Sequence, residues 1–317
     1  MRGQIAIAIV AAMAMPAAAD PNDLVLSRLG TRITDPNGIL TGVVGQNLEF
    51  RELSSQLGVV LAPHLLTPAD TVGFSGFQMS VDYAATTIDS GAEYWRAART
   101  SGTSSMMNTV GFFVRKGMWF PVPSFEVGAG AVHLIDSHTW ASQLYAKVAL
   151  HEGYHDLPLP SLAVRGAVSR MMNQRELDLT VASLDAMISK HIGVGGTWRF
   201  DPYVGWNVLF IIPRSEVIDP TPNIDSLQPG NNSDSLLNFT FKDQDNITRQ
   251  RFFAGAKMQY YIFQLTLELQ YALAGSSVDD RAGTNTGCML MSTTTNCDAK
   301  DQAKAQRTLA FSAGFDF

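Results

Sequence analysis

The chain has 317 residues, of which 46% are hydrophobic and only 16% are charged, and its formal net charge is −6. The mean hydropathy is close to zero, at +0.04. A disordered chain is excluded because disorder needs low hydrophobicity and high net charge, and a bundle of membrane helices is excluded because it needs repeated apolar runs of about 20 residues. A soluble β-rich or α/β protein fits, as does a membrane β-barrel whose alternating strands average to neutral hydropathy. The negative charge and the absence of a Lys/Arg cluster argue against a nucleic-acid partner.

Residues 1–19 have the pattern of a secretory signal. Arg2 precedes an apolar run from Ile5 to Met15, and small residues lie directly before Asp20. The apolar run is too short to span a bilayer. We therefore expect export through a cleaved signal peptide and a mature chain that begins at Asp20.

Residues 20–73 lack the alternation of a strand. Within them, residues 47–61 place Leu53, Leu57 and Val60 at roughly helical spacing. Two interpretations are open for this N-terminal segment. It forms either a periplasmic helix or cap below a barrel, or a plug inside the barrel lumen.

The remainder, residues 74–317, contains segments in which apolar and polar residues alternate with period two. In the clearest of them, Phe263, Leu265 and Leu267 alternate with polar neighbours. Ten strands are predicted, at 74–84, 108–119, 123–135, 139–150, 161–172, 177–190, 200–212, 250–260, 262–273 and 305–317. Most are longer than usual globular strands and have the length of tilted membrane-spanning strands. Residues 55–63 and 236–242 could raise the number to 12.

Residues 151–155 (HEGYH) match the H-E-x-x-H pattern of zinc hydrolases, in which a helix brings two imidazoles onto one metal ion. Here the pattern follows a predicted strand, Gly153 disfavours a helix, and prolines follow closely. We expect a polar turn and a chance match. No catalytic residue, metal or cofactor is therefore predicted, and His151 and His155 are only a weak candidate metal pair.

The only two cysteines, Cys288 and Cys297, lie in the polar stretch 276–304. In an exported protein a close pair of this kind is most simply a disulfide within one loop. A metal site would need more ligands at tighter spacing.

The C-terminal residues 307–317 alternate up to the last residue, Phe317. This segment resembles the closing strand of Gram-negative outer-membrane β-barrels, in which the assembly machinery recognises a terminal Phe. The alternative is the last strand of a periplasmic sandwich. The resemblance implies an all-β, antiparallel, up-and-down transmembrane barrel in the outer membrane, with Phe317 as its assembly signal.

Three short pieces look similar to proteobacterial barrels loosely grouped with the FadL family. They are residues 162–166 (LAVRG), 188–190 (ISK) and 202–205 (PYVG). Barrels of the FadL kind carry an N-terminal plug in the lumen and take up hydrocarbons. The resemblance therefore implies a plug role for residues 20–73 and a small, hydrophobic solute.

The connections between the predicted strands differ in length on the two sides of the barrel. An even number of strands places both termini on the periplasmic side. The connections on the outer side are then 85–107, 136–138, 173–176, 213–249 and 274–304, and they include the longest. Short periplasmic turns and long external loops are typical of outer-membrane barrels.

Charged residues of both signs are expected on the lumen face. They are Asp82, Arg115, Glu126, Lys147, Arg165, Asp185, Lys257 and Glu268. They either select solutes in a pore or form an internal network of ion pairs that fills a narrow barrel.

The function predicted from the sequence is that of a narrow channel or uptake porin for a small solute. A structural or adhesive barrel acting through its external loops is the alternative, and an outer-membrane hydrolase is the second alternative. Expected partners are outer-membrane lipids, lipopolysaccharide, the barrel-assembly machinery and a small solute.

Overall fold

The computed structural model describes residues 20–153, 159–224, 227–228, 234–244, 247–279 and 300–317. The elements in chain order are η1 (Leu26–Leu29), β1 (Gly30–Thr34), β2 (Leu40–Gly45), α2 (Asn47–Leu61), β3 (Phe77–Thr87), α3 (Glu93–Ala98), β4 (Met106–Met118), β5 (Phe125–Leu134), β6 (Trp140–His151), β7 (Ser161–Met172), β8 (Leu177–Ser189), β9 (Ile192–Val194), β10 (Trp198–Ser215), η2 (Asp234–Leu237), β11 (Ile247–Tyr260), β12 (Phe263–Ala272) and β13 (Gln306–Asp316).

Within the described residues, ten antiparallel strands close into a barrel, which confirms the predicted fold class and strand number. The strands β3–β8 and β10–β13 pair in sequence order. The last strand then pairs with the first, from Thr308 opposite Thr86 to Asp316 opposite Gln78. The short β9 adds only to one end of β10. Closure gives every wall strand two neighbours, so the sheet has no free edge.

The distribution of side chains across the wall is the reverse of that in a soluble protein. In β12, the polar residues Gln264, Thr266 and Glu268 point inward and are buried, whereas Leu267 and Leu269 point outward and are 52% and 60% exposed. The same alternation runs along β7 and β13. An outward apolar surface of this kind needs a hydrocarbon environment.

Strand boundaries agree with the predicted ones except for small shifts. The largest shifts are of three residues. β10 ends at Ser215 instead of residue 212, β11 begins at Ile247 instead of residue 250, and β3 spans Phe77–Thr87 instead of 74–84. Gly73 and Ser75 have positive φ angles of 78° and 70°, so the backbone turns there before it becomes extended.

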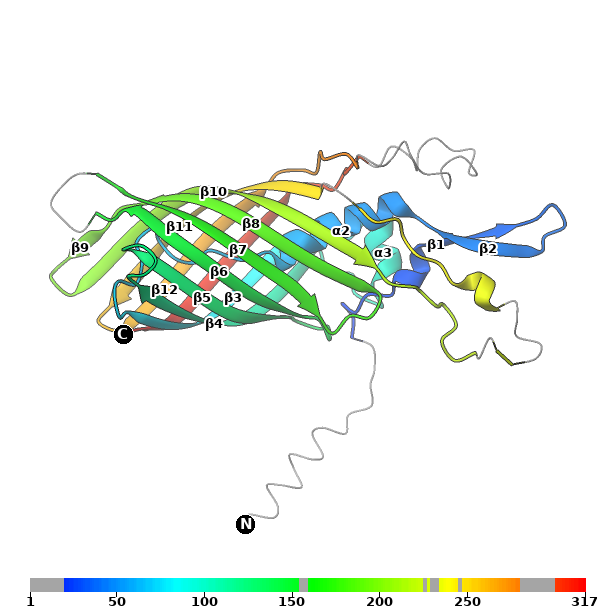
Figure 1. Cartoon of the computed structure of the whole chain (residues 1–317), viewed down its shortest axis with the longest axis horizontal. Helices are drawn as coiled ribbons and strands as arrows, with labels where there is room; N and C mark the ends of the chain where they lie inside the picture. The colour runs from blue at the N-terminus through cyan, green and yellow to red at the C-terminus, as the bar shows by residue number, and fades with distance from the viewer. Residues whose placement is uncertain (1–19, 154–158, 225–226, 229–233, 245–246, 280–299) are drawn as a thin grey trace, which may run out of the picture.

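The two ends of the barrel have different connections (Figure 1). We call one of them the loop end, because the long connections 88–105, 216–246 and 273–305 begin and end there. The opposite end, here the turn end, carries residues 119–124, 152–153, 159–160, 190–197 and 261–262 and the C-terminus. Phe317 is held there by reciprocal backbone hydrogen bonds with Phe77, at 2.8 and 2.9 Å.

The segments that could have added strands do not join the barrel. Residues 55–63 belong mostly to α2, and residues 236–242 contribute only η2 and an isolated bridge between Ile218 and Phe239. In the part of the chain that is described, no helix has the length and apolar character to cross a membrane.

Candidate functional site in the barrel lumen

The N-terminal segment begins at the loop end. The backbone N–H of Asn22 donates to the carbonyl of Asp136 at 2.8 Å, and that of Leu26 donates to Glu176 at 2.7 Å. Both acceptors lie in short connections of the loop end. Residues 20–45 therefore lie at the opposite end of the barrel from Phe317, which corrects the expectation that both ends of the chain share one side.

A hairpin, β1–β2, follows and projects beyond the loop end (Figure 1). Its turn is built on Asp35, whose Oδ1 accepts the N–H groups of Asn37 and Ile39 at 2.9 and 2.7 Å. Phe239 packs against Gly30 so closely that a Cβ there would lie 2.8 Å from the ring. This hairpin was not predicted from the sequence, although its Asn37-Gly38 pair is a common hairpin turn signal.

Helix α2 then enters the lumen, and its buried surface includes both apolar and polar side chains. Leu53, Leu57 and Val60 are fully buried against inward aliphatic residues of β8 and β10. Two of the polar side chains are bonded to the loops, because Ser55 donates to Asp301 at 2.6 Å and Gln56 accepts from Trp95 at 2.6 Å. The loop-end part of the lumen is thus shaped for this helix.

After α2, residues 62–72 run extended through the lumen to the turn end, with residues 62–71 buried. These residues form neither helix nor strand, so their backbone groups need other partners. Cations of the wall supply donors to the carbonyls. Arg251 donates to Pro63 at 2.7 Å, and Arg165 donates to His64 at 3.0 Å.

Lys147 makes the densest set of contacts with this extended segment. Its Nζ lies 2.9 Å from the carbonyl oxygen of Asp70, 3.2 Å from that of Pro68 and 3.1 Å from the hydroxyl of Thr67. It is also 3.1 Å from Glu126 Oε1, with both side chains fully buried. The lysine therefore joins the wall to the segment.

Carboxylates of the wall complement these cations by accepting the backbone N–H groups of the segment. Glu268 accepts from Leu66 at 3.0 Å, and Glu126 accepts from Val72 at 2.9 Å. Charged acceptors and donors give stronger hydrogen bonds than neutral ones. The wall charges therefore act on the segment as a neighbouring strand would.

The charges that hold the segment are aligned by the register of the sheet. Cross-strand pairing places six residues in one row, in the order Glu126, Lys147, Arg165, Asp185, Asn207 and Arg251. Neighbours in such a row have adjacent side chains on the same face. Arg165 and Asp185 pair at 2.5 Å within it. The row surrounds the segment on six of the barrel strands.

The structure places all eight predicted lumen residues inside the barrel, each no more than 6% exposed. Besides the pairs in the row, Asp82 lies 3.7 Å from Arg115, and Lys257 lies 3.0 Å from Asp316 near the turn end. Arg251 was not among the predicted lumen residues, although it lies on the same face of β11 as Lys257. It also omitted the contributions of Arg51 and Gln56, which come from the helix.

The remaining candidate residues are positioned as follows. His151 ends β6, and Glu152 accepts hydrogen bonds from the Thr71 hydroxyl at 2.6 Å and from Ser124 at 2.7 Å. Glu152 thus fastens the end of the lumen segment to a turn. His155 and both Cys288 and Cys297 lie outside the described residues.

Glycines on the inner face make room for aromatic rings, which gives a prediction for Gly128. A Cβ at Gly128 would lie 2.1 Å from the ring of Tyr145, which donates to Glu126 at 2.6 Å. We expect Gly128→Ala to destabilise the barrel by about 1–3 kcal/mol, because the ring must move. Gly166 is the matched control, since a Cβ there would meet nothing within 4 Å. Urea unfolding in detergent micelles should separate the two variants, and equal stability would contradict the packing assignment.

Glu52 on α2 gives a prediction of pH dependence. It is half-buried at the loop end, where burial first, and then the charges of Asp301, Glu49 and Asp89, raise its pKa to about 7. Because the folded state holds this proton more tightly than the unfolded state, the contribution of Glu52 to stability falls as the pH rises from about 4.5 to about 7. Glu52→Gln should be more stable than the wild type at pH 8, with the difference vanishing near pH 4. An unchanged difference between these pH values in urea titrations would refute it.

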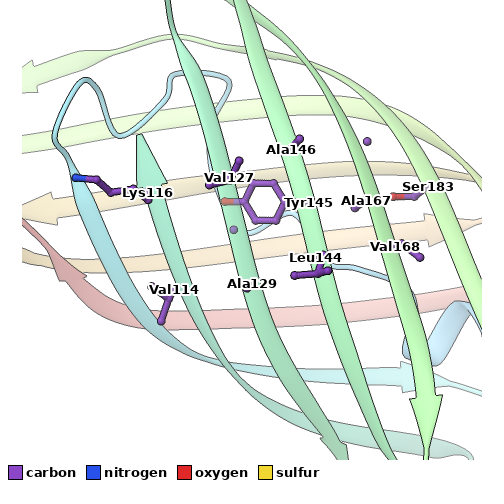
Figure 2. Close-up of a pocket in the computed structure, with 12 residues that line it drawn as sticks. Val114, Lys116, Val127, Ala129, Leu144, Tyr145, Ala146, Ala167, Val168 and Ser183 are labelled. Atoms are coloured by element: carbon purple, nitrogen blue, oxygen red, sulfur yellow. The ribbon is translucent and has the colours of Figure 1, made fainter. Parts of the chain in front are cut away.

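The outer wall carries a hollow of about 740 Å³ across β4–β8 (Figure 2). Small outward residues, Ala129, Ala146 and Gly166, leave space beside the larger Leu144 and Val168. Continuous strand pairing behind the hollow separates it from the lumen. It is a depression in the apolar outer surface of the wall.

No family model and no curated protein matches this chain. Among solved structures, it is similar to the attachment invasion locus protein Ail of Yersinia pestis, with 8% identity over 77% of this chain and 99% of that chain and a TM-score of 0.26. It is also similar to Neisserial surface protein A, with 10% identity, coverage of 76% and 95%, and a TM-score of 0.29. A third is the outer membrane protein Omp33 of Acinetobacter baumannii, with 9% identity, coverage of 76% and 99%, and a TM-score of 0.23.

These neighbours are Gram-negative outer-membrane β-barrels, and at such low identity the likeness concerns the fold alone. The comparisons do not show the similarity to FadL-like barrels.

Proposed function

We propose that this protein is an integral outer-membrane barrel that its own N-terminal segment closes to solutes, and that it acts through the surface of its loop end. One observation carries this conclusion. The chain runs from the loop end through the whole lumen to the turn end before β3 begins, and residues 50–71 are almost entirely buried, apart from the half-buried Glu52.

The outward surface supports placement in a membrane. Its side chains are large and apolar along the strands, and aromatic residues such as Trp119, Trp140 and Tyr261 are exposed near the strand ends. Outer-membrane lipids and lipopolysaccharide would contact this surface, and the assembly machinery would bind β13 with Phe317. The long connections would then face outward from the cell and the short turns would face the periplasm.

The loop end would present a folded platform to the exterior. It combines the projecting hairpin β1–β2 with α3, η2 and the long connections, and the hairpin exposes Ile33 and Ile39. Isolated two-stranded hairpins are only marginally stable, so the packing of Phe239 on Gly30 and of Phe241 on Gly45 supports this one. We assign the protein a structural or adhesive role that depends on this platform.

A solute channel is the alternative. It would require residues 47–72 to leave the lumen, which breaks their hydrogen bonds to buried charges of the wall. Such charges are costly to leave unpaired. The proposal includes no hydrolase activity and no cofactor.

Labelling of single cysteines on intact cells tests the orientation. In a Cys288→Ser/Cys297→Ser background, Asn37→Cys lies at the exposed hairpin tip, and Thr197→Cys is the matched exposed position at the turn end. With a maleimide on a polymer too large to cross the outer membrane, we expect labelling of Asn37→Cys on intact cells. Thr197→Cys should react only after permeabilisation. The reverse pattern, or protection of both positions, would overturn the proposed orientation with the loop end on the cell surface.

A further inference from the structure

Three side chains with metal-binding atoms converge where the N-terminal segment meets the loop end. They are Asp20 and Asp23 at the start of the described chain and His138 in the connection between β5 and β6. His138 Nδ1 lies 2.8 Å from an oxygen of Asp23 and 3.5 Å from an oxygen of Asp20. The three side chains thus present one nitrogen and two oxygens to a common point.

The geometry is compatible with one ion. All three ligand atoms lie within 4.8 Å of one another. Donor atoms bonded to one zinc ion at about 2.0–2.2 Å are separated by at most about 4.4 Å. The distances from His138 Nδ1 to the oxygens of Asp23 and Asp20, 2.8 and 3.5 Å, lie below that limit. A metal ion could therefore replace the hydrogen bond between His138 and Asp23 without a large movement of the backbone.

The local backbone already holds the two aspartates in place. The N–H of His138 donates to Asp23 Oδ1 at 2.8 Å, which orients this carboxylate toward the ring. The N–H of Asp23 donates to the carbonyl of Asp20 at 3.0 Å, which forms a turn that brings both carboxylates to the same side.

A fourth donor would be created by the expected cleavage before Asp20. The nitrogen of Asp20 lies 2.9 Å from Asp23 Oδ2, the same oxygen that contacts His138. As a free amine it would add a nitrogen ligand. A set of imidazole, amine and carboxylates suits borderline ions such as Zn²⁺, whereas Ca²⁺ and Mg²⁺ prefer oxygen ligands alone.

We propose that Asp20, Asp23 and His138 form a binding site for Zn²⁺ or a similar divalent transition metal, which fastens the N-terminal segment to the outer rim of the barrel. The site is separate from the lumen contacts and does not depend on whether the lumen conducts. It joins residues 20–23 to a barrel connection about 115 residues later in the chain.

Zinc titration of the mature protein, which begins at Asp20, tests the site by calorimetry in detergent after removal of metals with a chelator. We expect one saturable Zn²⁺ site, weakened at least tenfold by His138→Asn and by Asp23→Asn, and no comparable binding of Ca²⁺. His191→Asn is the matched control, because His191 also contacts an aspartate, Asp201, at 2.8 Å but belongs to no such three-residue group among the described residues.

Hydrogen exchange gives a second measurement. Zn²⁺ should slow exchange at residues 20–29 in the wild type but not in His138→Asn. Heat-dependent gel migration shows that each variant is folded. The proposal is overturned by the absence of saturable binding, by equal affinity in the wild type and both variants, or by binding that is lost only in His151→Asn or in the Cys288→Ser/Cys297→Ser variant.

Discussion

Replacing Lys147 by Met should destabilise the barrel by about 3–5 kcal/mol, the range for removing one partner of a buried ion pair. The ammonium group contacts the carboxylate of Glu126, the carbonyls of Pro68 and Asp70 and the hydroxyl of Thr67, all in the buried lumen. Met matches the length of the side chain but donates no hydrogen bond. Urea unfolding in detergent micelles measures the loss, and hydrogen exchange should accelerate over residues 62–72.

Two controls distinguish this network from a general effect of losing a lysine. Lys116→Met removes an exposed lysine from the outward face of β4 and should change stability by no more than about 0.5 kcal/mol. Glu126→Gln combined with Lys147→Met should cost less than the sum of the single changes, because the single lysine change leaves a buried carboxylate without this partner. A loss below about 1 kcal/mol for Lys147→Met, or strict additivity, would contradict the assigned network.

Gly58→Leu should displace helix α2 from the wall. A Cβ at Gly58 would lie 2.6 Å from Cδ1 of Ile211 and 2.7 Å from its Cγ2. Overpacking of a well-packed interior costs about 1–3 kcal/mol and occasionally more, and we expect leucine to reach the upper end of that range. Unfolding in urea measures the loss.

The sign of the effect of Gly58→Ala separates packing from helix propensity. Propensity alone predicts a gain of about 0.5–1 kcal/mol for alanine over glycine inside a helix. Close packing against Ile211 predicts a net loss. Adding Ile211→Ala should restore part of the stability of Gly58→Leu, because it removes the atoms that clash. A stabilising Gly58→Ala, or no rescue by Ile211→Ala, would place α2 away from this part of the wall.

The barrel wall could be predicted from the sequence because period-two alternation has a direct physical cause. One face of each strand contacts hydrocarbon and the other faces a polar interior, as in β12 with Leu267 and Glu268. The same alternation correctly predicted that Lys147 and Arg165 face the lumen. It would also have identified Arg251, which was omitted because the start of β11 alternates less regularly.

The contents of the lumen could not be derived in the same way. Alternation shows which way Lys147 points but not what it contacts, and its partners Pro68 and Asp70 lie in a segment without periodicity. The helix at 47–61 could be predicted from its spacing, whereas its position could not, because Arg51 and Gln56 are buried only through partners distant in sequence. The hairpin at 30–45 was missed because its strands are short and neither has a fully buried face.

Single-channel recording in planar bilayers tests the closed lumen most directly. The intact protein, shown to be folded by its heat-dependent gel migration, should give no stable conductance steps. Gly58→Leu, in which α2 is displaced, should give transient steps under the same conditions. Stable, ohmic steps from the wild-type protein, or transient steps as frequent as those of Gly58→Leu, would contradict a lumen that its own N-terminal segment closes.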